Sequence, residues 1–310
     1  MDREDILLVN MSDDEVRPLL APRPKDCHKG SFGYVALIGG SIEYSGAIRL
    51  AAMANAAMRS GAGVASIAAP RSICPVIASN IIEPTLLPLS DKDGELVFKE
   101  DELSKICERY DTIAFGMGIG LSDEVVKAVD YLLANYNKTL IVDADGLNAM
   151  SKLNKDRIRE SEASLVLTPH FKEFSRLSGL SVDEIKDDPE SAITNLADEL
   201  NAVILLKGST TFISEPAEYA KSLGLEKRRI FTSDTGCAGM ATAGSGDVLS
   251  GILSALCVNA KDLTLSVAAG AYINGRAGEI AQEMTSDISM TASDTALSIS
   301  DVITSIRETS

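Results

Sequence analysis

The stretch Tyr34–Ser41, YVALIGGS, is a short apolar run that ends in two glycines and a serine. Such a run, closed by a glycine turn, predicts a buried β-strand over Tyr34–Ile38. The segment from about Ala47 to Arg59 is dense in alanine and predicts a helix that packs closely on a sheet. Gly61–Gly63 ends this helix, and Val64–Ala68 predicts the next strand. A strand, a glycine turn, a helix and a further strand indicate a βαβ unit.

The same alternation continues along the rest of the chain. Apolar strands separated by helical stretches indicate a mostly parallel sheet with helices on both faces, and ligands at the carboxyl ends of the strands. We predict an α/β fold with a single domain over residues 25–310, preceded by an arm or short capping helix at residues 1–24. The further strands expected are Thr85–Pro88, Thr112–Phe115, Lys138–Val142, Leu165–Leu167, Val203–Leu206, its hairpin partner Phe212–Ser214, and Arg229–Thr232. Further helices are expected at about 121–134, 245–259, 263–283 and 291–308.

Composition limits the class of function. The chain has 310 residues, 45% hydrophobic and 24% charged, which is typical of a soluble globular protein with a large core. Aromatic residues make up 5%, Trp is absent and the net charge is −16, so no nucleic-acid partner is expected. No apolar run reaches the ~18 residues of a membrane span, and the acidic segment Met1–Asp5 is no secretory signal. Five scattered cysteines indicate a reducing cytoplasm and no metal site.

The segment Ala238–Gly251, AGMATAGSGDVLSG, carries the strongest chemical signal. Its glycines fall at the start of a helix whose apolar stripe begins at Val248. Unpaired N–H groups and the positive end of the helix dipole favour an anion there, and Gly244 and Gly246 leave the backbone open to it. Asp247 lies in the first turn, where the helix field is expected to keep its carboxylate ionised. An anion site beside a base suggests phosphoryl transfer; the alternative is an ordinary Gly-Ser turn with a first-turn acid.

Other polar clusters also follow predicted strands. Lys207–Thr211, KGSTT, is suited to phosphate or adenine contacts, although a solvated lysine at a turn is the alternative. Asp143 and Asp145 could orient a ligand or magnesium, or Asp145 could cap a helix. Gly39–Ser41 matches neither a Walker A loop nor a Gly-x-Gly-x-x-Gly fingerprint.

The chain has only two histidines, and both fall in loops. His170, at the carboxyl end of a strand, is placed to donate to a ligand amide or phosphate, whereas His28 is expected to cap a helix. Glu173 could hold a magnesium-bound water or be a first-turn helix acid. Two histidines and unpaired cysteines supply too few groups for a metal cluster or a Ser/His/Asp triad.

Seven motifs, taken in order, resemble one family: the ADP/ATP-dependent NAD(P)H-hydrate dehydratases, carbohydrate-kinase-like repair enzymes with a ribokinase-type fold. The likeness covers about residues 25–285. The family's usual Gly-Pro-Gly turn is Gly116-Met117-Gly118 here, and its usual Pro-Gly after the motif histidine is Phe171-Lys172. The motifs are His28–Gly33, Ile38–Ser41 with Tyr44–Ala47, Arg59–Gly63, Val142–Asn148, Leu167–His170, Leu206–Gly208 and Ala238–Gly251.

The resemblance implies an activity and a set of site residues. The S epimer of NADHX or NADPHX, the hydrated and inactive cofactors, would be dehydrated to NADH or NADPH, with ADP or ATP as phosphoryl donor giving AMP or ADP and phosphate. Asp247 would be the catalytic base, and Mg²⁺ and a homotetramer are implied as well. Residues that match the family's substrate contacts are Ala47, Gly118, His170 and Asp247, and those that match its nucleotide contacts are Lys207, Gly208, Ser209, Thr210, Thr211 and Gly246.

Two other functions fit the same motifs. A ribokinase-like kinase of a small alcohol, such as a vitamin precursor, would use the same anion site and base but stop at the phosphate ester. A nucleotide-binding regulator without turnover would not need a carboxylate in the anion's own pocket. A NAD(P)HX epimerase is often fused in this family, and residues 1–24 leave no room for one here, so the resemblance leaves open a separate epimerase as partner.

Overall fold

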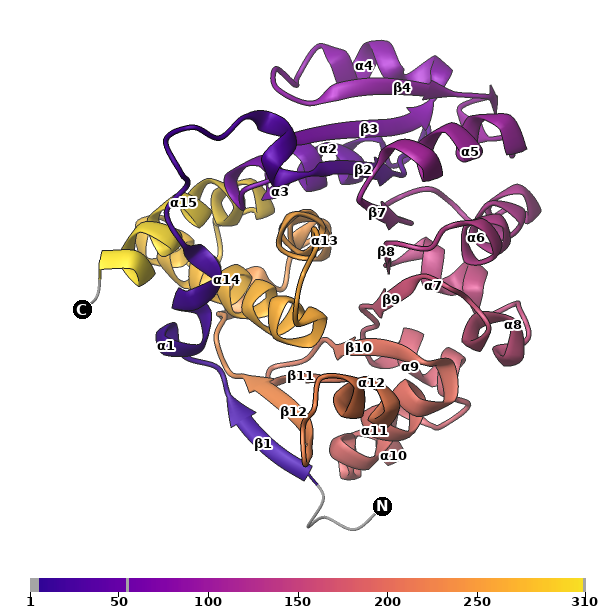
Figure 1. The fold of residues 1–310 in the computed structure, drawn as a ribbon. Helices are drawn as coiled ribbons and strands as arrows, with labels where there is room; N and C mark the ends of the chain where they lie inside the picture. Colours follow the sequence, from indigo (N-terminus) through magenta and orange to yellow (C-terminus); the bar gives the residue numbers. More distant parts are fainter. Residues whose placement is uncertain (1–5, 54–55, 309–310) are drawn as a thin grey trace.

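The computed structural model describes residues 6–53 and 56–308, and one long, curved sheet runs through them (Figure 1). Its strands are β1 (Ile6–Asn10), β2 (Tyr34–Ile38), β3 (Val64–Pro70), β4 (Thr85–Leu89), β7 (Thr112–Phe115), β8 (Thr139–Val142), β9 (Ser164–Leu167), β10 (Ala202–Leu206), β11 (Thr211–Ser214) and β12 (Arg228–Ser233). They lie in the order β1-β12-β11-β10-β9-β8-β7-β2-β3-β4. Only the pairs made by β11 are antiparallel, so the other carboxyl ends share one edge.

Alternate side chains of each strand enter two separate cores. Val35 and Leu37 of β2 pack with one set of helices, whereas Ala36 and Ile38 pack with another on the opposite face. The first set is α1 (Asp13–Val16), α2 (Ser45–Met53), α3 (Ala56–Arg59), α4 (Cys74–Ala78), α13 (Ser245–Leu256), α14 (Leu263–Met284) and α15 (Ala292–Glu308). The second set is α5 (Glu100–Arg109), α6 (Asp123–Asn135), α7 (Asp145–Met150), α8 (Lys155–Arg159), α9 (Phe171–Ser178), α10 (Val182–Asp187) and α11 (Pro189–Leu200). The predicted α/β fold, mostly parallel and covered on both faces, is confirmed.

Two small elements complete the fold. A hairpin of β5 (Asp91–Lys92) and β6 (Glu95–Leu96) stands apart from the main sheet, and α12 (Ala217–Ser222) connects β11 to β12. The helix expected from about Ala47 to Arg59 is present as α2 and α3, and residues 54 and 55 between them lie outside the described residues. The segment Met1–Asp5 also lies outside the described residues.

The prediction of an arm over residues 1–24 is wrong for Ile6–Asn10. This stretch is β1, which pairs in parallel with β12 from Ile6 opposite Arg228 to Asn10 opposite Thr232. Leu7 and Leu8 are 49% and 54% exposed, because β1 is an edge strand with little apolar cover. An edge strand of this kind lacks the periodicity of a buried one, which is why the sequence pattern did not indicate it.

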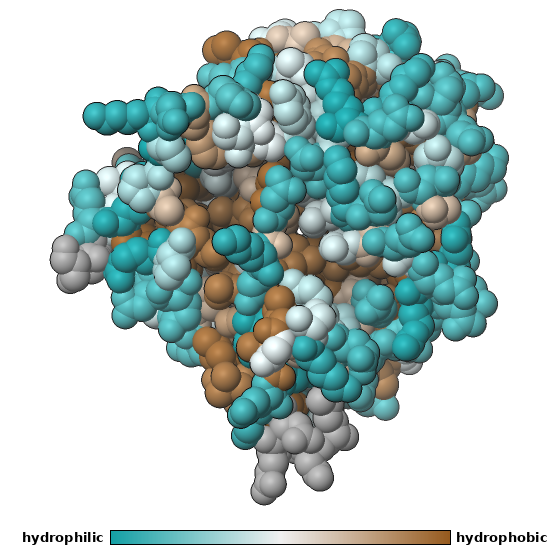
Figure 2. Space-filling model, viewed as in Figure 1, coloured by the Kyte–Doolittle hydropathy of each residue, from teal (hydrophilic) through white to brown (hydrophobic). Residues whose placement is uncertain are grey.

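The surface is mostly polar on the face drawn in Figure 2, and apolar groups come to the surface in its middle, in the region of α13 and α14. Within the described part of the chain, no helix has the length and apolar character needed to cross a membrane. The α13 side chains from Val248 to Ala255 are buried, and the N-terminus of this helix forms the site described next.

Candidate active site

The N-terminus of α13 is the centre of the site. Gly244 is its N-cap with a φ of 98°, and a side chain there would place its Cβ 2.4 Å from the Leu50 Cδ1 atom. Ser245 Oγ donates to the Met240 carbonyl at 2.8 Å, which holds the preceding loop against the helix. The first backbone N–H groups of a helix have no carbonyl partner within it, so they remain available to an anion. The helix start predicted from Ala238–Gly251 is confirmed.

A buried ion pair lies directly beside this helix end. Asp143, which follows β8 and is 1% exposed, accepts from Lys207 Nζ at 2.7 Å and from Ser250 Oγ of α13 at 2.8 Å. Burial alone would raise the pKa of Asp143, but Lys207 and these hydrogen bonds hold it below its ordinary value. Burial would likewise lower the pKa of Lys207, and Asp143 and Glu173 raise it above its ordinary value. Both members are therefore charged, and Lys207 is no solvated turn lysine.

Asp247, in the first turn of α13, has a carboxylate whose pKa is strongly raised. Burial raises its pKa to about 7, the nearby charge of Asp143 adds to the rise, and Lys207 opposes it. The expectation that the helix field keeps Asp247 ionised is therefore wrong, because burial and a second carboxylate outweigh that field. A carboxylate that titrates near neutral pH is suited to proton transfer.

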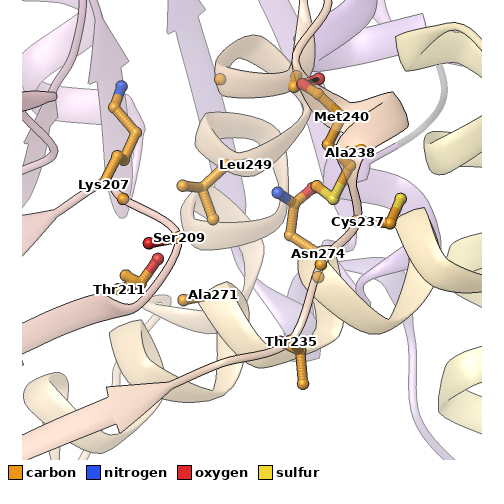
Figure 3. Close-up of a pocket in the computed structure, with 15 residues that line it drawn as sticks. Lys207, Ser209, Thr211, Thr235, Cys237, Ala238, Met240, Leu249, Ala271 and Asn274 are labelled. Carbon is orange, nitrogen blue, oxygen red and sulfur yellow. Dashed lines mark hydrogen bonds between the residues drawn. The ribbon is translucent and has the colours of Figure 1, made fainter. Parts of the chain in front are cut away.

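A first pocket, which we call the lysine pocket, has a volume of about 460 Å³ and opens on one side of α13. In Figure 3, Leu249 lies between two groups of lining residues. One group is Lys207, Ser209 and Thr211, and the other is Asn274, Met240 and Cys237. The lining residues are Lys207, Gly208, Ser209, Thr211, Thr235, Gly236, Cys237, Ala238, Met240, Ser245, Gly246, Leu249, Ala271, Asn274 and Gly275. Five of the six predicted nucleotide contacts thus lie together, and only Thr210 is not among them.

A second pocket, the acidic pocket, has a volume of about 610 Å³. It is lined by Ser41, Glu43, Tyr44, Ala47, Glu95, Gly118, Gly120, Leu121, Asp145 and Asp247. Three predicted substrate contacts, Ala47, Gly118 and Asp247, therefore lie together. Four carboxylates and no Lys, Arg or His occur among the described residues of this lining, so the pocket favours hydrogen-bond donors over anions.

Five other predicted side chains serve the local structure. His170 is the N-cap of α9, and its Nδ1 accepts from the N–H groups of Lys172 and Glu173 at 3.1 and 3.2 Å. Glu173 completes this capping box by accepting from His170 N–H at 2.9 Å. Thr210 Oγ1 donates to Asp234 at 2.5 Å. Asp145 accepts from Gly120 N–H at 3.0 Å instead of capping α7, and His28 is the expected N-cap of a short 3₁₀-helix.

Neither pocket includes His170 among its described lining residues, so its contact with substrate stays a prediction. Conversely, the sequence reasoning missed Glu43, Glu95 and the loop residues 235–237, which have no distinctive local pattern. Asn274 had one usable signal, since it is a polar residue inside an otherwise apolar stretch of α14.

Magnesium can be accommodated only together with a nucleotide. In the described ranges, no three His, Cys, Asp or Glu side chains are grouped so as to hold a metal ion by themselves. Each Asp143 oxygen already accepts a hydrogen bond. Mg²⁺ bound to nucleotide phosphates needs only one or two carboxylates, often through water. Glu173 is buried beside the charge of Lys207, burial raises its pKa above the ordinary value, and it is not among the described lining residues of either pocket, so a contact with Mg²⁺ stays a prediction.

Comparison with known proteins shows which family the sequence resembles. The sequence model described as NAD(P)H-hydrate dehydratase matches residues 35–302. A bifunctional NAD(P)H-hydrate repair enzyme, Nnr, of Thermofilum pendens is 35% identical over 266 residues, 85% of this chain and 48% of the relative. The chain thus spans about half the length of such bifunctional relatives. An ADP-dependent (S)-NAD(P)H-hydrate dehydratase of Neisseria meningitidis is 31% identical, over 84% of this chain and 81% of the relative.

Solved structures agree as well. An ADP/ATP-dependent NAD(P)H-hydrate dehydratase of Bacillus subtilis, co-crystallised with ATP and Mg²⁺, superposes with a TM-score of 0.79 at 27% identity, over 95% of this chain and 97% of the other. A ribokinase-like superfamily protein of Enterococcus faecalis has a TM-score of 0.79 at 23% identity, over 96% of both chains, which shows the fold alone. With the family match over residues 35–302, this chain belongs to the NAD(P)H-hydrate dehydratase family and has its ribokinase-like α/β fold.

Proposed function

We propose that this chain dehydrates the S epimer of NADHX and NADPHX to NADH and NADPH, using ADP or ATP as phosphoryl donor and releasing AMP or ADP and phosphate. One observation carries the proposal: Gly246 and Asp247, neighbours in the chain, line different pockets. A phosphoryl group bound at the N-terminus of α13 would lie between a nucleotide in the lysine pocket and an alcohol in the acidic pocket.

The nucleotide occupies the lysine pocket with its phosphates toward Lys207 and Gly246. A Cβ on Gly246 would lie 3.6 Å from both Lys207 Nζ and Asp143 Oδ2, so an oxygen anion over this glycine reaches the backbone and the ammonium group, and Lys207 offsets the charge of Asp143. Lys207 gives one of its three donors to Asp143 and keeps the others for the phosphates. These fixed donors stabilise the negative charge that spreads over the phosphoryl group during transfer.

The hydrated nicotinamide ring occupies the acidic pocket, where carboxylates accept from its hydroxyl and carboxamide groups. Asp247 takes the hydroxyl proton as the oxygen forms a bond to the terminal phosphorus, and the bond to the nucleotide's bridging oxygen breaks. The carbon–oxygen bond of the resulting ester then breaks, phosphate leaves with that oxygen, and the adjacent ring carbon loses a proton. The ring recovers its double bond.

We propose that Mg²⁺ enters with the nucleotide, with the phosphates as its main ligands and Glu173 holding a metal-bound water. Such an ion would neutralise part of the phosphate charge. A homotetramer, a cytoplasmic location and a separate NAD(P)HX epimerase that supplies the S epimer remain predictions from the family resemblance.

The proposal is tested by its products. Purified protein incubated with NADHX and either ADP or ATP should restore the absorbance of NADH and release one phosphate per NADH. The same should hold with NADPHX. A phosphate ester that persists would instead assign a small-alcohol kinase, and nucleotide binding without any turnover would assign a regulator.

Asp247→Asn should reduce kcat by about 10²–10⁴-fold, because the amide cannot accept the hydroxyl proton. The nucleotide Kd, measured by calorimetry, should hold or fall, since the change removes a negative charge beside the phosphates. Asp294→Asn is the matched control, because Asp294 is the first-turn acid of α15 and lies outside both pockets. Turnover by Asp247→Asn within a few-fold of wild type would remove Asp247 from the base role.

The kcat/KM for NADHX should fall as the pH is lowered through about 7, the pKa of Asp247. Below that pH the carboxyl group is protonated and cannot act as a base; above it the carboxylate is available. Initial rates between about pH 6 and 8, at fixed ionic strength, measure this limb. A flat profile would show that the ionisation of Asp247 does not control the rate, and a limb that persists in the residual activity of Asp247→Asn would show that another group titrates.

A further inference from the structure

Asn274 is a buried polar side chain whose amide oxygen accepts no hydrogen bond from the described residues. It lies within α14, is 7% exposed and lines the lysine pocket. Its Oδ1 atom has no hydrogen-bond partner among the described residues. A buried acceptor without a partner is destabilising, and because this one lines a pocket, a ligand with a hydrogen-bond donor would satisfy it.

The other polar groups at this end of the pocket already have partners. Thr235 Oγ1 lies 2.8 Å from Ser233 Oγ and can donate to the Tyr272 carbonyl at 3.3 Å. The Cys237 thiol donates to the Gly278 carbonyl, at 3.2 Å. The loop's backbone is also engaged, since Gly236 N–H donates to Glu279 and Gly239 N–H donates to Gln282, each at 3.0 Å. At this end of the lysine pocket, Asn274 is therefore the side chain available to form hydrogen bonds with a ligand.

The surroundings of Asn274 suit a flat ring. Leu249, Ala271 and Met240 line this part of the pocket with apolar atoms. Gly275 brings the loop close to α14, because a Cβ at that position would lie 2.2 Å from Thr235 Oγ1. Lys207 lies across the pocket, on the far side of Leu249 (Figure 3). If phosphates bind at Lys207, the base of the same nucleotide extends toward Asn274.

We infer that Asn274 selects the base of the nucleotide by pairing with adenine. Its Oδ1 accepts from the 6-amino group, and its Nδ2 donates to the neighbouring ring nitrogen, the pairing that an Asn amide makes with adenine. The inference rests on the proposed function only in taking the lysine pocket as the nucleotide site. A base without the amino group leaves Oδ1 unpaired and buried, so it binds more weakly.

Calorimetry tests this with two nucleotides that differ only at the 6 position: ADP and purine riboside 5′-diphosphate, which lacks the amino group. Wild-type protein should bind ADP about 10- to 100-fold more tightly, the range expected for one buried hydrogen bond. Asn274→Leu should bind the two nucleotides about equally, because the apolar side chain cannot distinguish them. Asn274→Ser is measured alongside it, so that poor folding of one variant leaves the other to decide.

Thr211→Val is the matched control, because Thr211 lines the opposite end of the same pocket and should change both affinities by one factor. Equal binding of the two nucleotides by wild type, or a preference for ADP that survives in both Asn274 variants, overturns the inference. So does a variant that loses discrimination against 2′-deoxy-ADP alone, which would place Asn274 on the ribose. Because no NADHX is used, loss of the proposed dehydratase activity with normal ADP selectivity would overturn the proposed function and leave Asn274 in place.

Discussion

The buried ion pair between Asp143 and Lys207 connects the parts of the molecule that form the site. It joins the carboxyl ends of β8 and β10, and Ser250 adds α13 to the same cluster. Removing one partner would leave an uncompensated buried charge, a loss of about 3–5 kcal/mol in comparable pairs. The pair also sets the site's electrostatics, because Lys207 offers a cation beside Gly246 while Asp143 raises the pKa of Asp247. One interaction thus prepares both the anion site and the base.

Local signals in the sequence were sufficient for the framework and for half of the site. Apolar runs and glycine turns indicated the buried strands, and the glycines before Val248 marked the N-terminus of α13. Pairing over long distances in sequence was beyond such signals: Asp143 and Lys207 are 64 residues apart, and neither position shows that the other neutralises it. The same limit explains why the sequence led us to expect an ionised Asp247. The burial of this carboxylate and its nearness to Asp143, which raise its pKa, exist only in the folded chain. The capping role of His170 was likewise not evident from the sequence, because a capping imidazole and a ligand donor occupy the same kind of loop.

The division of the site into two pockets suits the proposed reaction, which a kinase-like fold alone would not suggest. Gly246 and Asp247 keep donor and acceptor one residue apart, an arrangement suited to phosphoryl transfer to any well-placed alcohol. The dehydration that follows depends on the substrate, because a phosphate ester on a carbon next to a ring nitrogen is readily expelled by the nitrogen's electron pair. The protein therefore needs one base and one anion site, and the acidic pocket supplies a lining that accepts hydroxyl and amide donors.

Transfer of the phosphoryl group to the substrate's own hydroxyl is the central step of the proposed reaction, and isotopic labelling follows it directly. NADHX prepared by hydrating NADH in oxygen-18 water carries the label in that hydroxyl. After turnover with ADP, mass spectrometry of the released phosphate should find one labelled oxygen per molecule, because the carbon–oxygen bond breaks after the phosphorus–oxygen bond has formed. Unlabelled phosphate, with the oxygen-18 recovered in water, would contradict phosphoryl transfer through Asp247 and the N-terminus of α13.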